Sequence, residues 1–137
     1  TVIGYIAMGN LGDLLLGEGK LEESVEQLTT CIENIEGKRP SFAAAFRGSL
    51  AWAKAQLGEF DAARELLDTG ESQLRGVWVV ELGRLLCRRA QVEHAAGCPE
   101  KAEAALNEAK SIAEQVGGSA DSDLGQMITE AESLMLA

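Results

Sequence analysis

A threefold internal repeat constrains this chain more than any other feature of its sequence. The turn glycines Gly19, Gly58 and Gly97 are spaced 39 residues apart, twice. Self-similarity at a fixed period is typical of chains built from stacked copies of one small unit. Three further sets of equivalent positions recur at the same spacing of 39 residues. They are Leu28, Leu67 and Leu106, the small residues Ser24, Ala63 and Ala102, and the small residues Gly12, Ala51 and Ala90.

Each copy has the pattern of a helical hairpin. Apolar residues recur with the 3.6-residue period of an amphipathic helix on both sides of each turn glycine. Glycine ends the first helix because it adopts a positive φ, and an acidic residue three positions later begins the second. Plentiful Ala, Leu and Glu, with only two Pro and one Tyr, favour helix over strand. We predict helices at residues 2–17, 21–36, 41–57, 60–75, 78–96, 99–116 and 121–136.

The turns also predict how the chain is divided. We expect one domain over residues 1–137, with repeats at about 1–39, 40–77 and 78–117. The helix at about 121–136 has no hairpin partner, and a lone amphipathic helix is how a solenoid covers its last exposed face. The chain begins on an apolar segment without an initiator Met, so we predict that it is a fragment of a longer protein.

Small and large residues at these offsets resemble the tetratricopeptide repeat, in which small residues let two helices approach and large neighbours fill the gaps. The first copy carries the resemblance in Leu11-Gly12, Ser24 and Leu28. The resemblance implies an all-α, right-handed α-solenoid of three helical hairpins plus a C-terminal capping helix. The period of 39 exceeds the family's usual 34, and Arg47 and Arg89 occupy columns that are usually apolar.

Two segments, residues 57–63 and 82–89, also resemble the long-period C-terminal arrays of large bacterial signalling and regulatory ATPases or kinases. This second resemblance implies a sensor or scaffold role within such a parent protein. It assigns none of the parent's activity to this chain.

The tetratricopeptide resemblance also implies a binding surface, because the first helix of each hairpin lines the concave side of such arrays. It implies a groove with an apolar end, Trp52 as an aromatic anchor, and a basic end at Arg84 and Arg88 that suits a peptide carboxylate. The candidate binding residues on this face are Asp13, Leu16, Trp52, Gln56, Arg84, Arg88, Gln91 and His94.

Each of these assignments has an alternative that the sequence leaves open. Trp52 is equally well explained as a residue packed between repeats. Arg84 and Arg88 are also explained by ion pairs with acidic side chains of the same chain. His94 is the single histidine, and a helix-surface role needs no further partner residue.

Composition narrows the function. A net charge of −10 disfavours binding to nucleic acid and to anionic lipid, and no apolar run is long enough to span a membrane. The sequence has no phosphate-binding loop, metal-ligand cluster or nucleophile motif, so we predict no enzyme activity, no metal and no cofactor. The three cysteines are an odd number and no two of them have the C-x-x-C spacing, which favours a reducing, cytoplasmic setting.

The sequence therefore predicts a non-catalytic module that binds a protein or peptide. The partner could be another domain of its own parent protein or a second copy of the chain. Two alternatives remain. One is a homo-oligomerisation scaffold, since Val2, Ile3, Tyr5 and Ile6 make the first helix apolar. The other is a small-molecule-sensing array of a bacterial regulator.

Overall fold

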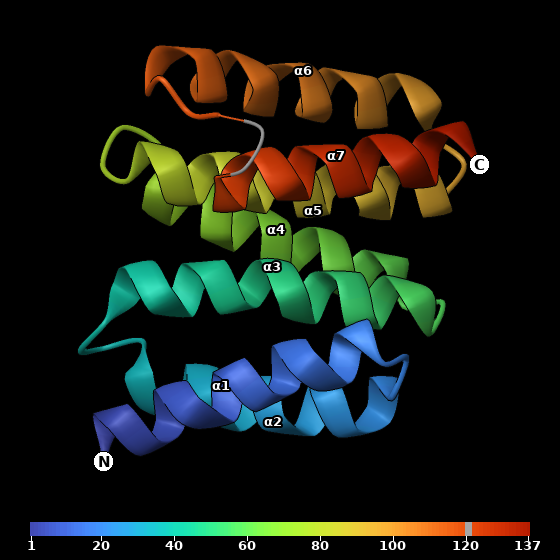
Figure 1. Cartoon of the computed structure of the whole chain (residues 1–137). Helices are drawn as coiled ribbons and strands as arrows, with labels where there is room; N and C mark the ends of the chain where they lie inside the picture. The colour runs from blue at the N-terminus through green and yellow to red at the C-terminus, as the bar shows by residue number, and fades with distance from the viewer. Residues whose placement is uncertain (120–121) are drawn as a thin grey trace.

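The computed structural model describes residues 1–119 and 122–137, and it shows helices packed side by side in a stack (Figure 1). The described residues form seven helices and no strand. Every predicted helix is present. The predicted start of the last helix, residue 121, lies outside the described residues, and every other end lies within one residue of its predicted position. The helices are α1 (Val2–Gly17), α2 (Leu21–Ile35), α3 (Pro40–Gln56), α4 (Phe60–Leu74), α5 (Val79–Ala95), α6 (Pro99–Gln115) and α7 (Asp123–Leu136).

The hairpins turn on glycines in the left-handed region, as predicted. Gly19, Gly58 and Gly97 have φ of 78°, 85° and 79°. In the first turn, the N–H of Lys20 donates to the carbonyl of Leu15 at 2.9 Å, and the N–H of Gly19 donates to the carbonyl of Leu16 at 3.1 Å. This pair of bonds is the Schellman motif, which satisfies carbonyls that the helix end leaves free. The two later hairpin turns make the same two bonds.

Small residues bring the two helices of each hairpin close together. A Cβ atom on Gly12 would lie 2.6 Å from Cγ of Leu28, so α1 and α2 meet without room for a side chain at this position. The hydroxyl of Ser24, on α2, is fully buried and donates to the carbonyl of Gly12 at 2.7 Å. The other residues in the two small columns are also fully buried, namely Ala51, Ala63, Ala90 and Ala102.

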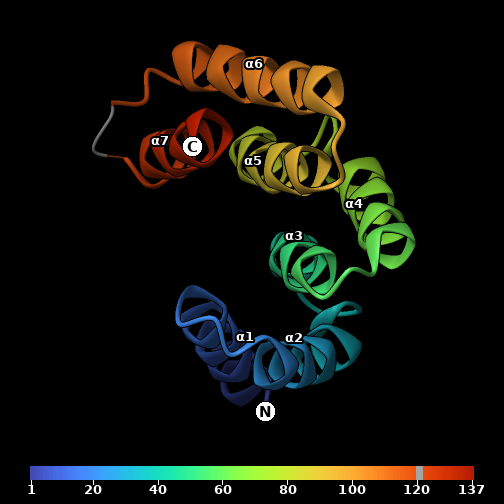
Figure 2. The ribbon, with the colours of Figure 1, turned by 90° about the vertical axis from the view of Figure 1, so that its right-hand side faces the viewer.

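The hairpins stack into an arc with two layers (Figure 2). Helices α1, α3, α5 and α7 lie along the inner side, and α2, α4 and α6 lie along the outer side. Helix α7 packs against α5 and α6, and it buries Leu124, Ile128 and Ala131 in the core. The fold is an all-α helical repeat solenoid. None of the described helices combines the length and apolar character needed to cross a lipid bilayer.

The apolar core is split into two clusters that share α3. The N-terminal cluster joins α1, α2 and α3, and Leu28, Ile35 and Phe46 are among its members. The C-terminal cluster runs from α3 to α7, and it includes Ala51 and Leu85. A solenoid is stabilised between neighbouring units in this way, with no single centre.

Candidate functional site

A cavity of about 300 Å³ opens on the inner side of the arc, between the four helices of that layer. Spacings of three and four residues place the lining side chains of each helix on one face. Helix α3 supplies the widest stripe, beginning at Phe42 in its first turn. The residues that line this concave cavity are Asn10, Asp13, Phe42, Ala45, Phe46, Ser49, Arg84, Arg88, Asp123 and Met127.

An ion pair between Arg84 and Asp123 lies at the mouth of the concave cavity. It joins α5 to the first turn of α7, and the two side chains are 37% and 71% exposed. Ion pairs this exposed stabilise a fold by about 0–1 kcal/mol, because water screens them. The pair therefore opens at little loss of stability.

A second pair of opposite charges, Asp13 and Arg88, lies deeper in the concave cavity. Burial raises the pKa of Asp13, while a hydrogen bond from Ser49 and the charge of Arg88 partly offset that shift. Burial likewise lowers the pKa of Arg88, whose Nη1 donates to Oε1 of Gln91 at 3.1 Å. Oδ1 of Asp13 and Nε of Arg88 are buried without a hydrogen-bond partner. Charges desolvated in this manner are typical of functional sites.

Aromatic side chains give the concave cavity its apolar surface. Phe42 is 48% exposed, whereas Phe46 is buried. The ring of Phe46 fits against α1 because residue 9 is glycine, and a Cβ atom there would lie 2.5 Å from Cζ of Phe46. The cavity thus combines a fixed aromatic wall with an accessible aromatic side chain.

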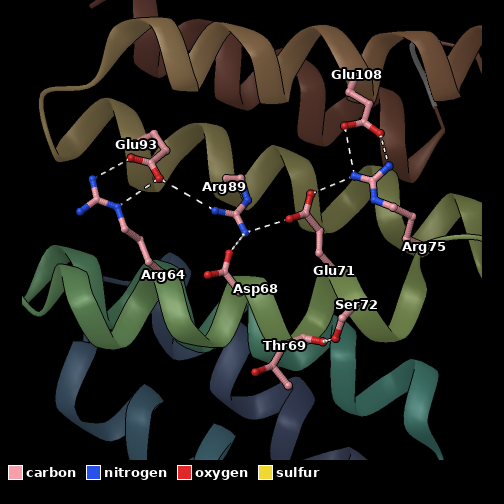
Figure 3. Close-up of polar contacts among 9 residues, drawn as sticks. All are labelled: Arg64, Asp68, Thr69, Glu71, Ser72, Arg75, Arg89, Glu93 and Glu108. Carbon is pink, nitrogen blue, oxygen red and sulfur yellow. Dashed lines mark hydrogen bonds and ion pairs between the residues drawn. The ribbon is translucent and has the colours of Figure 1, made fainter.

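The outer side of the arc carries a second cavity, of about 470 Å³, between α4, α5 and α6. Its most buried acid is Glu93, which is 2% exposed. Arg64 donates to both oxygens of Glu93, from Nη2 at 2.8 Å and from Nε at 3.2 Å (Figure 3). This bidentate hydrogen bonding lowers the pKa of Glu93 and outweighs the effect of burial.

Two further arginines belong to the same network of ion pairs (Figure 3): Arg89, which lines the convex cavity and also lies 4.0 Å from Glu93, and Arg75, which does not line it. Arg89 donates to Asp68 at 2.7 Å and to Glu71 at 2.9 Å. Arg75 donates to Glu108 at 2.7 Å and to Glu71 at 3.0 Å. These bonds link α4 to α5 and α6, so arginine at position 89, in a column that is usually apolar, joins neighbouring repeats.

The tetratricopeptide repeat family model matches residues 5–36, which contain all of α2 and most of α1. The chain therefore contains a tetratricopeptide repeat at residues 5–36. Repeats of this family generally mediate protein–protein interaction and are generally non-catalytic. Neither a curated protein nor a solved structure matches the chain. Among the described residues, no group of three or more His, Cys, Asp or Glu side chains is placed to hold a metal ion.

The structure brings together three of the eight candidate binding residues. Asp13, Arg84 and Arg88 line the concave cavity. Leu16 is buried in the helix packing, and Gln91 is buried as the acceptor for Arg88. The ion-pair alternative therefore holds for Arg84, because Asp123 of the same chain is its partner.

The other three candidates lie outside the concave cavity. Trp52 is half-buried against the C-terminal core cluster, in agreement with the packing alternative. Gln56 is exposed, and its Nε2 donates to the carbonyl of Trp52 at 3.4 Å. His94 is half-buried in the last turn of α5.

Sequence reasoning missed several residues of the concave cavity. Phe42 and Ser49 lie on one stripe of α3, at a spacing of seven residues, and this stripe is visible in the sequence. The family resemblance selected a neighbouring stripe that contains Trp52. Asp123 and Met127 carry no such signal, because only the packing of α7 against α5 brings them to the cavity.

Proposed function

We propose that this chain is a non-catalytic interaction module that binds a peptide or protein segment in its concave cavity. The observation that carries the proposal is that all four inner helices line one cavity with paired charges and an exposed aromatic ring, Phe42. Aromatic anchors in a pocket with a polar rim are typical of binding hot spots. The family's general role in protein–protein interaction supports the same function.

The test is selection of a phage-displayed library of random dodecapeptides on the folded chain. We expect the selected peptides to bind Phe42→Ala about tenfold or more weakly, the loss typical of a hot-spot side chain. Trp78→Ala is the matched control, since Trp78 is also partly exposed, at 36%, and begins α5 away from the cavity. Equal binding to both variants would contradict the concave assignment.

A second copy of the chain is the alternative partner that one observation favours. Helix α1 turns a stripe away from the core in which Ile3 is 82% and Leu14 is 61% exposed. Apolar surface of this kind supports self-association. Sedimentation of the wild type and of Ile3→Ser with Leu14→Ser tests it, and a wild-type monomer at high concentration would exclude this alternative.

A small-molecule ligand is the remaining alternative. The concave cavity, at about 300 Å³, is at the lower end of the range for pockets that hold small ligands. A metabolite that raises the melting temperature of the wild type, and not of Phe42→Ala, would favour it over a peptide.

We also propose that the module works in the cytoplasm, as part of a larger bacterial signalling or regulatory ATPase or kinase. The support is the resemblance of residues 57–63 and 82–89 to such arrays, together with three free cysteines, of which Cys31 and Cys87 are buried. The coding sequence upstream of Thr1 tests the parent. The net charge of −10 supports partners other than nucleic acid or anionic lipid.

A further inference from the structure

Helix α7 contributes side chains to both the core and the concave cavity. Leu124 and Ile128 are buried in the C-terminal core cluster. Asp123 and Met127 lie four residues apart and line the concave cavity, and Met127 also packs against the C-terminal core cluster. The chain therefore places its own carboxylate, followed one turn later by an apolar side chain, in the cavity where we propose that a partner binds.

The two arginines of the concave cavity differ in how accessible they are. Arg88 is the deeper one, where burial lowers its pKa and the charges of Asp13 and Glu130 oppose that effect. The side chain of Arg84 is 37% exposed, and its partner Asp123 is 71% exposed. An external carboxylate that reaches the cavity therefore meets Arg84 first. It can replace Asp123 with little loss, because the displaced carboxylate returns to water.

We propose that Asp123 is an internal competitor for Arg84, and that the ligand is a peptide segment with an aspartate or glutamate beside a large apolar side chain. This inference rests on the proposed function of the concave cavity. The carboxylate of the ligand takes the place of Asp123 on Arg84, and its apolar side chain contacts Phe42 and Met127. Asp123 is 71% exposed and pairs only weakly with Arg84, so a ligand carboxylate that the bound peptide shields from water gains slightly from the exchange. Apolar contact therefore provides most of the affinity, and the acid adds a modest preference.

The chain offers a matched control for Asp123. Glu132 lies on the same helix and pairs with Lys110 of α6 at 2.7 Å, with side chains 40% and 43% exposed. It is not among the residues that line the concave cavity. Asp123→Asn and Glu132→Gln therefore each remove one exposed ion pair of α7, and only the first frees Arg84.

The experiment measures the affinity of the tightest selected dodecapeptide, synthesised once with its acidic residue and once with the corresponding amide. We expect Asp123→Asn to bind the acidic peptide about two- to fivefold more tightly than the wild type, the range that an exposed pair of up to about 1 kcal/mol allows. Glu132→Gln should match the wild type. Arg84→Gln should bind the acidic and amide peptides equally. Asp123→Ser serves as a second variant if Asp123→Asn does not fold.

The outcomes separate this inference from the proposed function. Peptides that depend on Phe42 but show no preference for an acidic residue would overturn the inference and leave the proposed function standing. An equal gain in Glu132→Gln, or no gain in Asp123→Asn and Asp123→Ser, would overturn it in the same way. Selection of no peptide, or binding that is insensitive to Phe42→Ala, would overturn both.

Discussion

The concave and convex cavities of this protein use the same types of side chain in opposite ways. On the convex side, the carboxylates of Glu71, Glu93 and Glu108 all bind arginines of the network. On the concave side, the carboxylate of Asp13 keeps a buried oxygen without a hydrogen-bond partner, and the pair at the mouth is largely exposed. The convex network also has one buried atom without a hydrogen-bond partner, Nε of Arg89, but its carboxylates are all paired. The comparison separates a network that joins repeats from a cavity with less fully paired charges, where we propose that a partner binds.

The pKa values of two buried acids express the same contrast. That of Glu93 is lowered, chiefly by the hydrogen bonds from Arg64, so its ionised form stabilises the fold. That of Asp13 is raised, chiefly by burial, so its ionised form destabilises the fold. A shift in pKa between the unfolded and folded states is a contribution to stability. The convex acid and the concave acid should therefore respond to pH with opposite signs.

The largest expected effect is on the wall of the concave cavity, which depends on close packing. A side chain at position 9 would collide with Phe46 and with Sγ of Cys31, at 2.5 and 2.8 Å from its Cβ. We expect Gly9→Val to lower the free energy of unfolding by about 3 kcal/mol in urea denaturation. Gly17→Ala is the control, because nothing lies within 4 Å of its Cβ, and it should leave stability unchanged or slightly raised. Equal effects would show that this wall has room to repack.

The second-largest effect is expected when the most buried acid of the convex network, Glu93, is replaced. Glu93→Gln leaves Arg64 and Arg89 without that charge, and we expect a loss of about 2 kcal/mol in urea denaturation. The loss is smaller than for fully buried pairs because Arg64 is 32% exposed. In the wild type, the ionised form of Glu93 contributes fully to the free energy of unfolding above its ordinary pKa of 4.5. This contribution is lost as pH falls through the lowered pKa of the folded state. The variant should lack this acid-dependent loss, and a variant as stable as wild type at pH 7 would remove the structural role we assign.

The third effect has the opposite sign. Asp13→Asn removes a poorly compensated buried charge, and we expect the free energy of unfolding at pH 7 to rise by about 1 kcal/mol. The pKa of Asp13 in the folded state lies above its ordinary value of 3.8. The contribution of Asp13 to the free energy of unfolding of the wild type therefore decreases as pH rises from 3.8 through the raised pKa. The variant should lose that dependence. A less stable variant would show that the ionised form of Asp13, like that of Glu93, stabilises the fold.

The smallest effect concerns the exposed pair at the mouth of the concave cavity. Arg84→Gln should change the midpoint of thermal unfolding little, since we expect a loss of at most about 0.5 kcal/mol. The preference for acidic peptides should nevertheless disappear. A loss as large as that of Glu93→Gln would show that the pair fastens α7 to α5, and the two cavities would then serve the same purpose.

Local sequence signals were sufficient for the helices. Gly19, Gly58 and Gly97 each adopt a positive φ directly after a helix, and apolar periodicity indicates which stretches bury one face. The residues of the concave cavity were predictable only in part. Asp13, Arg84 and Arg88 followed from the family resemblance, but the stripe on α3 was placed on Trp52 when the cavity is lined by Phe42 and its neighbours. The reason is that apolar periodicity identifies the buried face of a helix, but it does not identify which of the other faces points to the concave side.

The sequence alone thus determined the units of this protein, because a helical hairpin depends on residues that are close along the chain. Only the tertiary structure decided which charges meet. Arg84 and Asp123 are 39 residues apart, and Arg64 and Glu93 are 29 apart, so their pairing depends on how the hairpins stack. At such separations along the chain, the sequence does not determine which charged side chains of different helices face one another. The packing of α7 on α5, and of α4 on α5, sets whether an arginine is closed in a network or left available to a partner.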